Sequence, residues 1–436
     1  MKKATAIKRF LLALFVLLVL AGLVAIFRPS GGGSIGQTVT FSDGTTMTLK
    51  AVTYGTQHRY LGGGWEQRLL SLLPRKLAAK LSSQQSTLTM GRPSVALWFE
   101  RVGTGPATGD PQFVLCDASG YGICGLSGGL RMGATGSWIE GWAFEFWPRR
   151  ERTFTLRIYE QGKRYPDAKS LGEFTLRNPA PDKYPVWTAQ EPPLTAREGD
   201  LSVTLFDVTA GVGRGANKWK PAPNPTVSTT RVGFRVERNG QPTKEWEITS
   251  VKASDATGNF LAGIRSTSQE RDAEYVELQP YPWPAEQAWK LRVGLSQRSN
   301  FVASQLWTLR GVPSSGEVPT NTAATQTNLQ GALVQYAGQL PNMRGKTFFN
   351  FRVTPARPDY RFMLVKAVDD RGVETSLHGT FEAIPSWVVG VPIPNWGFAL
   401  ETNATSYDLT LALHQTRYVE FLVRPRIIST NEAAPR

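Results

Sequence analysis

The stretch Cys116-Asp-Ala-Ser-Gly-Tyr-Gly-Ile-Cys-Gly-Leu126 has a close counterpart later in the chain, Ser254-Asp-Ala-Thr-Gly-Asn-Phe-Leu-Ala-Gly-Ile264, and a shorter one at Asp369-Asp-Arg-Gly372. Asp, Ser, Asn and Gly favour tight turns, and the flanking residues are apolar, so each copy predicts a β-hairpin. We expect the Asp to hydrogen-bond its own backbone, because an EF-type calcium loop needs several acids spaced two apart. One local structure is therefore predicted three times.

Segments that alternate apolar and polar residues surround each turn in the same order, which is typical of strands with one buried face. They are 95–101, 153–159 and 174–177 in the first unit, 231–237, 288–293 and 307–310 in the second, and 347–353, 406–411 and 421–424 in the third. Proline-bearing segments at 179–193 and 312–326 separate the units, as linkers do. The chain is therefore predicted to be all-β, with three tandem antiparallel β-sandwich domains at 36–180, 194–312 and 327–436.

Cys116 and Cys124 are the only cysteines of the chain. Folding the hairpin about Gly120 is expected to set them directly opposite each other, at a distance that a disulfide can span. Their spacing does not match a CxxC redox motif, and the three histidines are too scattered to complete a zinc site. A local disulfide in the first unit is the prediction.

The N-terminus has the pattern of a membrane anchor. Residues 1–9 are basic, and Phe10–Phe27 is an unbroken apolar run that forms a helix of about 27 Å, close to the thickness of a hydrocarbon core. The cations before Phe10 predict a cytoplasmic N-terminus at 1–9, a single transmembrane helix at 10–27 and a flexible tether at 28–35. The alternative is a signal peptide cleaved after Ala21, which would give a secreted protein.

The formal net charge is +14, and the cations are spread along the chain. No nucleic-acid-binding motif accompanies them, so anionic head groups or acidic polymers are more plausible partners than nucleic acid. Nucleophile elbows, HExxH, P-loop and dinucleotide-binding patterns are absent from the sequence. The expectation is a non-enzymatic protein without catalytic residues, metal ligands or cofactors.

One loop differs greatly among the three units. The connection to the second main strand spans 56–94 in the first unit but only 212–230 and 339–346 in the others. Within the first, residues 65–81 predict a short amphipathic helical insert that contacts a membrane or another surface, or else packs on its own sandwich or the next domain. The candidate contact residues are Trp65, Arg68, Leu69, Leu73, Arg75, Lys76, Leu77 and Lys80.

Three tryptophans lie close together in the first unit, Trp138, Trp142 and Trp147. Exposed aromatic rings stack on sugars, so these are candidate sugar-binding residues. The alternative is ordinary packing, because aromatic side chains are common in β cores.

With about seven short strands per unit, residues 35–436 resemble immunoglobulin or fibronectin-type sandwiches in architecture. The antibody Cys…Trp…Cys spacing is absent. The whole chain resembles membrane-anchored, multi-sandwich ectodomains of bacteria. That resemblance implies a binding or spacer protein of the cell envelope, held by a single span in the cell (inner) membrane, with its domains extracytoplasmic. The alternatives are a carbohydrate-binding sandwich protein and a hydrolase whose site the motifs do not reveal.

Overall fold

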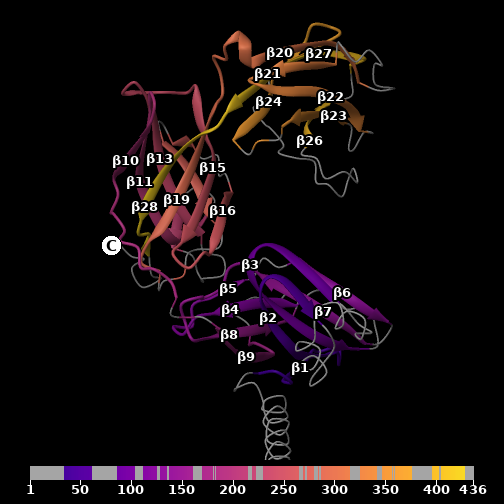
Figure 1. The fold of residues 1–436 in the computed structure, drawn as a ribbon, viewed down its shortest axis with the longest axis vertical. Helices are drawn as coiled ribbons and strands as arrows, with labels where there is room; N and C mark the ends of the chain where they lie inside the picture. Colours follow the sequence, from indigo (N-terminus) through magenta and orange to yellow (C-terminus); the bar gives the residue numbers. More distant parts are fainter. Residues whose placement is uncertain are drawn as a thin grey trace, which may run out of the picture.

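The computed structural model describes residues 34–60, 86–103, 111–124, 128–134, 137–160, 169–179, 181, 183–214, 219–221, 229–264, 269–270, 273–278, 283, 286–314, 325–340, 346–355, 357, 359–375, 395–401 and 404–427. Within these residues the chain forms antiparallel strands, apart from one short parallel pair, and a single 3₁₀ turn, η2 (Ala303–Gln305). The strands make three β-sandwiches that follow one another along the long axis of the molecule (Figure 1). The all-β, multi-sandwich prediction is confirmed at this level.

The first sandwich pairs a five-stranded sheet with a four-stranded one. The larger sheet has the order β1 (Thr38–Thr40), β2 (Thr46–Tyr60), β3 (Ser86–Val102), β7 (Ser137–Phe144) and β6 (Gly128–Ala134). The smaller sheet has the order β5 (Gly122–Cys124), β4 (Gln112–Cys116), β8 (Thr153–Tyr159) and β9 (Gly172–Arg177). Along β8 every second side chain is buried, so Phe154, Leu156 and Ile158 fill the core between the sheets.

The second sandwich is one continuous sheet that folds over on itself, because β16 pairs with both β15 and β18. One layer contains β10 (Leu194–Glu198), β11 (Leu201–Arg214), β13 (Thr229–Arg238) and β18 (Ala273–Leu278). The other contains β16 (Phe260–Ile264), β15 (Trp246–Asp255), β19 (Trp289–Gln297) and β28 (Arg417–Val423). Short edge pieces are β12 (Trp219–Pro221), β14 (Gln241–Pro242), β17 (Gln269–Glu270) and β29 (Arg426–Ile427).

The third sandwich consists of two separate four-stranded sheets. The first has the order β21 (Gln326–Leu329), β22 (Ala332–Leu340), β23 (Lys346–Thr354) and β26 (Asn395–Glu401). The second has the order β20 (Leu306–Pro313), β27 (Ser406–Gln415), β24 (Tyr360–Asp369) and β25 (Glu374–Thr375). In all three sandwiches the strand that carries the Asp turn thus lies inside its sheet, beside the strand that follows the turn.

The strand pairing corrects the predicted boundary between the second and third domains. The sequence order assigns β20 to the second sandwich and β28 to the third, but β20 pairs with β27 and β28 pairs with β19. Figure 1 shows the yellow C-terminal strand leaving the orange third sandwich and entering the magenta middle one. The third domain is therefore inserted into the second, which is completed only by the last strands of the chain.

The register shows that β28 occupies the place that β9 has in the first sandwich. Phe174 of β9 lies opposite Leu156, and Phe421 of β28 lies opposite Leu291 in the equivalent strand. Phe421 and its neighbours Val419 and Val423 belong to the hydrophobic core of the second sandwich. Only Thr416 separates β27 from β28. A hairpin needs at least about two loop residues, so β28 cannot fold back on β27 and continues into the neighbouring sandwich.

The three Asp turns have the same structure, as the sequence repeat predicts. In each turn one Asp oxygen accepts hydrogen bonds from the backbone N–H groups two and four residues later, at 2.7 to 3.0 Å. The Gly of each turn has a positive φ, which costs Gly little and other residues more. These Gly residues are Gly120, Gly258 and Gly372. The expected role of the Asp, bonding to its own turn, is confirmed.

The cysteines are not directly opposite each other, which corrects that part of the prediction. Cys116 lies opposite Gly122, and Cys124 lies opposite Val114, so the hairpin register is offset by two residues. Cys116 is buried. No disulfide is recorded among the side chains that the structure describes, and the side chain of Cys124 lies outside them. The cross-link remains a prediction.

The long loop of the first sandwich is shorter than the sequence suggested. Residues 56–60 and 86–94 continue β2 and β3 as a paired ladder that reaches Tyr60 opposite Ser86. The predicted helical insert at 65–81 lies outside the described residues, as does the predicted anchor within 1–33. In the part of the chain that is described, no helix combines the length and apolar character needed to cross a membrane.

Candidate functional site

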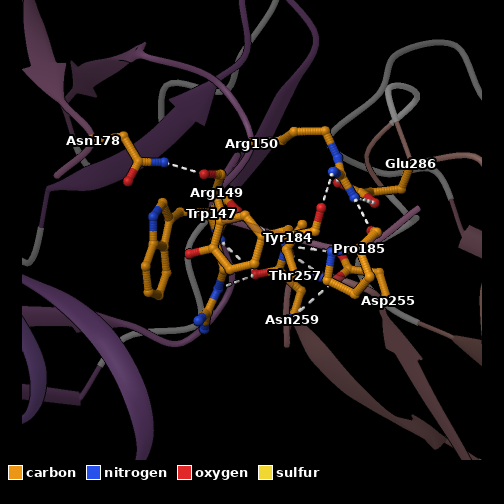
Figure 2. A network of polar contacts seen from close by, with 10 residues as sticks. All are labelled: Trp147, Arg149, Arg150, Asn178, Tyr184, Pro185, Asp255, Thr257, Asn259 and Glu286. Atoms are coloured by element: carbon orange, nitrogen blue, oxygen red, sulfur yellow. Dashed lines mark hydrogen bonds and ion pairs between the residues drawn. The ribbon is translucent and has the colours of Figure 1, made fainter. Parts of the chain in front are cut away.

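A network of polar contacts lies between the first and second sandwiches (Figure 2). We call it the 1–2 junction. On one side it contains Trp147, Arg149 and Arg150, in the segment that follows β7. On the other side it contains the Asp255–Asn259 turn and Glu286 of the second sandwich.

Asn259 is the centre of the 1–2 junction and is 1% exposed. Its amide Nδ2 donates to the backbone carbonyl of Trp147 at 3.0 Å, and its Oδ1 accepts from the Trp147 N–H at 3.2 Å. The side chain therefore binds the backbone of Trp147 as a neighbouring strand would. Nδ2 also donates to Asp255 Oδ2 at 2.9 Å, so the Asp turn fixes the orientation of the amide.

Arg149 is the buried cation of the junction. Its Nε donates to Asn259 Oδ1 at 3.0 Å, and its Nη2 donates to the carbonyls of Pro93 and Glu145. The guanidinium stacks on the Trp147 ring, with 3.6 Å between Cζ and the ring centroid. Burial lowers the pKa of Arg149, while nearby acidic groups oppose that change. Breaking these contacts would leave a charge unsatisfied in the interior, which is costly.

Arg150 forms a second contact across the same interface. Its Nε and Nη2 bond the two oxygens of Glu286 at 3.1 and 3.2 Å, a bidentate ion pair. Nη1 and Nη2 also donate to the carbonyls of Tyr184 and Pro185 in the linker. Glu286 is 8% exposed, and burial raises its pKa. Arg150 thus bonds both the linker and the second sandwich.

Aromatic side chains close the interface beneath these polar groups. Phe146 of the first sandwich stacks on Trp283 with 5.5 Å between ring centroids and contacts Trp289 at 6.0 Å. Tyr121, from the Asp117 turn, meets Trp283 edge-on. Rings in such arrangements stabilise an interface beyond their buried area. The 1–2 junction therefore combines buried polar contacts with aromatic packing, as a protein interior does.

Comparison of the three Asp turns shows what is special about this one. The residue four positions after the Asp is Tyr121 in the first turn, Asn259 in the second and Val373 in the third. Of the three, only Asn has an amide, whose separate N–H donor and C=O acceptor can pair with the N–H and C=O of one backbone residue at the same time. Asn259 was not predicted as a site residue from the sequence. The signal that could have indicated it is that the three repeats differ at this position and only the second has an amide there.

The second and third sandwiches are also held by more than a linker. The chain crosses between them twice, at 298–305 and at Thr416. The Thr416 N–H donates to the Asp359 carbonyl at 2.6 Å, and Phe301 contacts the His414 ring at 5.5 Å. Arg361 of β24 and Glu247 of β15 form an ion pair across the two sandwiches, with 3.9 Å between Nη2 and Oε1. We call this set of contacts the 2–3 crossing.

The three candidate sugar-binding tryptophans do not share an exposed face. Trp142 and Trp147 are 7% and 4% exposed, and both pack in the core cluster of the first sandwich. Trp138 is half-buried. The indole N–H groups of Trp138 and Trp142 donate to the carboxylate of Glu140, which is buried beside Arg101. These positions correspond to the packing alternative and offer no platform for a sugar ring.

A Ser–His pair lies in the β2–β3 ladder. His58 Nε2 is 2.7 Å from Ser94 Oγ, and His58 Nδ1 is 2.9 Å from Thr53 Oγ1. His58 and Ser94 are both 0% exposed, and burial lowers the pKa of His58. The hydroxyl of Ser94 also donates to the Gly55 carbonyl at 3.3 Å. These contacts give both ring nitrogens of a buried imidazole a hydrogen-bond partner. A catalytic nucleophile, in contrast, would need access to a substrate.

Across the described ranges, no group of three or more His, Cys, Asp or Glu side chains is arranged to hold a metal ion. The candidate surface-binding residues of 65–81 lie outside those ranges. No family model matches the chain, and a search of curated proteins returns no match.

Proposed function

We propose that this protein is a membrane-anchored, extracytoplasmic spacer of the cell envelope that holds its three sandwiches in a fixed relative geometry and has no enzymatic role. The observation that carries the proposal is the 1–2 junction, where Asn259 and Arg149 make buried hydrogen bonds across the interface. Domains joined by a simple linker move freely by default, so such an interface indicates selection for rigidity. The 2–3 crossing supports the same conclusion at the other end.

The anchor and the compartment in this proposal rest on the N-terminal sequence, Lys2 to Arg28. A spacer with a folded first domain beside the anchor would carry the second and third domains away from the bilayer. Of the two alternatives, carbohydrate binding has less support because Trp142 and Trp147 are buried. A hydrolase has less support because His58 and Ser94 are sealed from solvent.

The test measures the distance between the first two sandwiches in the full chain. Spin labels are attached through unnatural amino acids at Thr40 and Arg197, which are exposed and belong to different sandwiches. The wild-type protein should give one narrow distance distribution. Asn259→Val gives the second turn the Val that the third turn has at the equivalent position. Because this change removes the amide, the distance distribution should broaden.

The matched control is Val373→Ala, at the equivalent position of the third turn, where the side chain is 56% exposed. It should leave the measured distance distribution unchanged. A broad distribution in the wild-type protein would contradict the proposal. So would an unchanged narrow distribution in Asn259→Val, because the junction would then not depend on the contact that distinguishes it.

A further inference from the structure

A cavity of about 610 Å³ lies at an edge of the second sandwich, and none of its lining residues belongs to the 1–2 junction. Cavities of roughly 300–1,000 Å³ hold small ligands or short chain segments in many proteins. This one is lined by Glu191, Pro192, Phe206, Asp207, Val208, Arg424, Pro425 and Arg426.

The cavity corresponds to a gap in the hydrogen-bonded edge of β11. Strand β10 pairs with β11 as far as Leu205, and β29 begins to pair with it at Thr209. Among the described strands, none pairs with this edge at 206–208. The physical reason lies in the neighbouring prolines: Pro192 precedes β10 and Pro425 separates β28 from β29, and neither has an N–H to continue a ladder.

The walls of the gap are held in place by the C-terminal strand. The Gln190 N–H donates to the Leu422 carbonyl at 2.9 Å, and Gln190 forms a parallel bridge with Val423. The segments that carry Glu191 and Arg424 therefore run side by side. On β11 itself the gap is flanked by the paired strands β10 and β29, so hydrogen-bonded parts of the fold form the walls of the cavity.

The charge around the cavity is unbalanced. Asp207 is neutralised by Arg231, with 2.6 Å between Nη2 and Oδ2, and also accepts from Thr209 Oγ1. Arg424 and Arg426 are exposed, and within the described residues neither has an ion-pair partner. Glu191, also exposed, is the remaining acid of the lining. The Arg pair can therefore accept an external carboxylate.

The aromatic residue of the lining is Phe206, which lies at the bulge of the ladder between Leu205 and Asp207. Its ring is held edge-on by Tyr275 at 5.7 Å and is covered by the Arg235 guanidinium at 4.9 Å. The site thus combines a fixed ring, two arginines and an open strand edge. An open edge selects for peptide, because backbone N–H and C=O groups repeat along both chains with the same spacing.

We propose that this cavity binds an extended acidic peptide segment of a partner protein, which adds to the open edge of β11 and places a carboxylate against Arg424 and Arg426. The three open residues span about 10 Å, enough for a short strand. This inference goes beyond the spacer function and does not depend on the anchor or the 1–2 junction.

The test uses the purified full chain and a three-residue probe, Glu-Val-Glu-amide with a fluorescent dye on its N-terminus, whose extended length of about 10 Å matches the gap. Binding is followed by fluorescence anisotropy. We expect saturable binding, and a loss of about tenfold or more in affinity for Arg424→Ala/Arg426→Ala, because hydrogen bonds to charged groups are among the stronger ones. Arg197→Ala removes an exposed arginine of β10 outside the cavity lining and should bind as the wild type does. Thermal unfolding checks that each variant is folded.

A second probe carries N-methyl groups on its backbone amides, which prevents strand addition while keeping the carboxylates. It should bind at least about tenfold more weakly than the unmodified probe. Equal binding of the two probes would overturn strand addition. A third probe replaces each Glu with Lys and should not bind. Absence of binding of the Glu probe, equal binding of the Lys probe, or binding of inorganic polyphosphate in place of the peptide would overturn the proposal as a whole.

Discussion

Replacing Phe421 with Ala tests the exchange of strands between the second and third sandwiches. Phe421 is the sixteenth residue from the C-terminus and follows the third domain in sequence, yet its side chain is 5% exposed in the core of the second. It lies opposite Leu291 and contacts Phe234 at 6.3 Å between ring centroids. The substitution should therefore destabilise the middle of the chain and leave the third sandwich intact.

The expected magnitude follows from burial. Removing a phenylalanine side chain from a well-packed core costs about 3–5 kcal/mol, and an edge strand lies towards the lower end of that range. A loss of about 3 kcal/mol corresponds to a roughly hundredfold rise in the population of opened states. Amide hydrogen exchange of the full chain measures this change separately in each domain. Peptides from β15 and β19 should exchange faster by about this factor.

The mirror substitution is Leu309→Ala in β20. Leu309 precedes the third domain in sequence, but it is 6% exposed in that domain's core and lies opposite Leu409. This change should accelerate exchange in β22 and β24 and spare β15 and β19. Because each variant should accelerate exchange in a different sandwich, a general loss of stability could not explain the two results together.

The reverse pattern would refute the reasoning. If Phe421→Ala accelerates exchange in β22 and β24 but not in β15, each sandwich is completed by the strand next to it in sequence. Val334→Ala, in the core of the third sandwich, is the reference for a change confined to that domain. Its exchange pattern should match that of Leu309→Ala.

Two further predictions concern the third sandwich. Gly372→Ala should lower the stability of the third sandwich by about 1 kcal/mol in denaturant unfolding, because Gly372 has φ of +80° with no atom near the added Cβ. Gly91→Ala, in β3 of the first sandwich, is equally open but lacks a positive φ, so it should leave the stability of its own sandwich unchanged. Burial, with a smaller contribution from Arg361, lowers the pKa of His414 from 6.5 to about 4, so the unfolded state takes up a proton first as the pH falls. The unfolding free energy should therefore decrease between pH 7 and pH 4, by an amount on the order of 2–3 kcal/mol, and His414→Leu should flatten this dependence. An equally steep pH profile in His414→Leu would show that other groups cause it.

Local structure in this chain follows from local sequence. The alternation in 153–159 predicts a strand with the bounds that β8 has, because a period of two places one set of side chains on the core face. The Asp turns are predictable for the same reason. Their hydrogen bonds join atoms of residues 117 to 121, 255 to 259 and 369 to 373, so nothing beyond five residues is needed to form them.

The candidate site was less accessible to sequence reasoning. An Asn after the turn Gly is compatible with an exposed loop as well as with an interface, and only the position of Trp147 in the folded chain gives Asn259 its partner. The tryptophans illustrate the opposite difficulty. Their spacing permits an exposed platform, but whether an aromatic ring is exposed depends on the second sheet and the neighbouring domain, which bury Trp142 and Trp147.

What the sequence by itself determined is the strands, the turns and their threefold repetition. What only the tertiary structure decided is which sandwich each edge strand completes. The strands around Leu309 and Phe421 have similar apolar patterns and fit equivalent edges, so pattern alone does not distinguish their partners. The choice follows from the connection: Gln415-Thr-Arg417 contains no Gly, Pro, Asn or Asp and is too short to reverse the chain, so β28 continues straight from the third sandwich into the second.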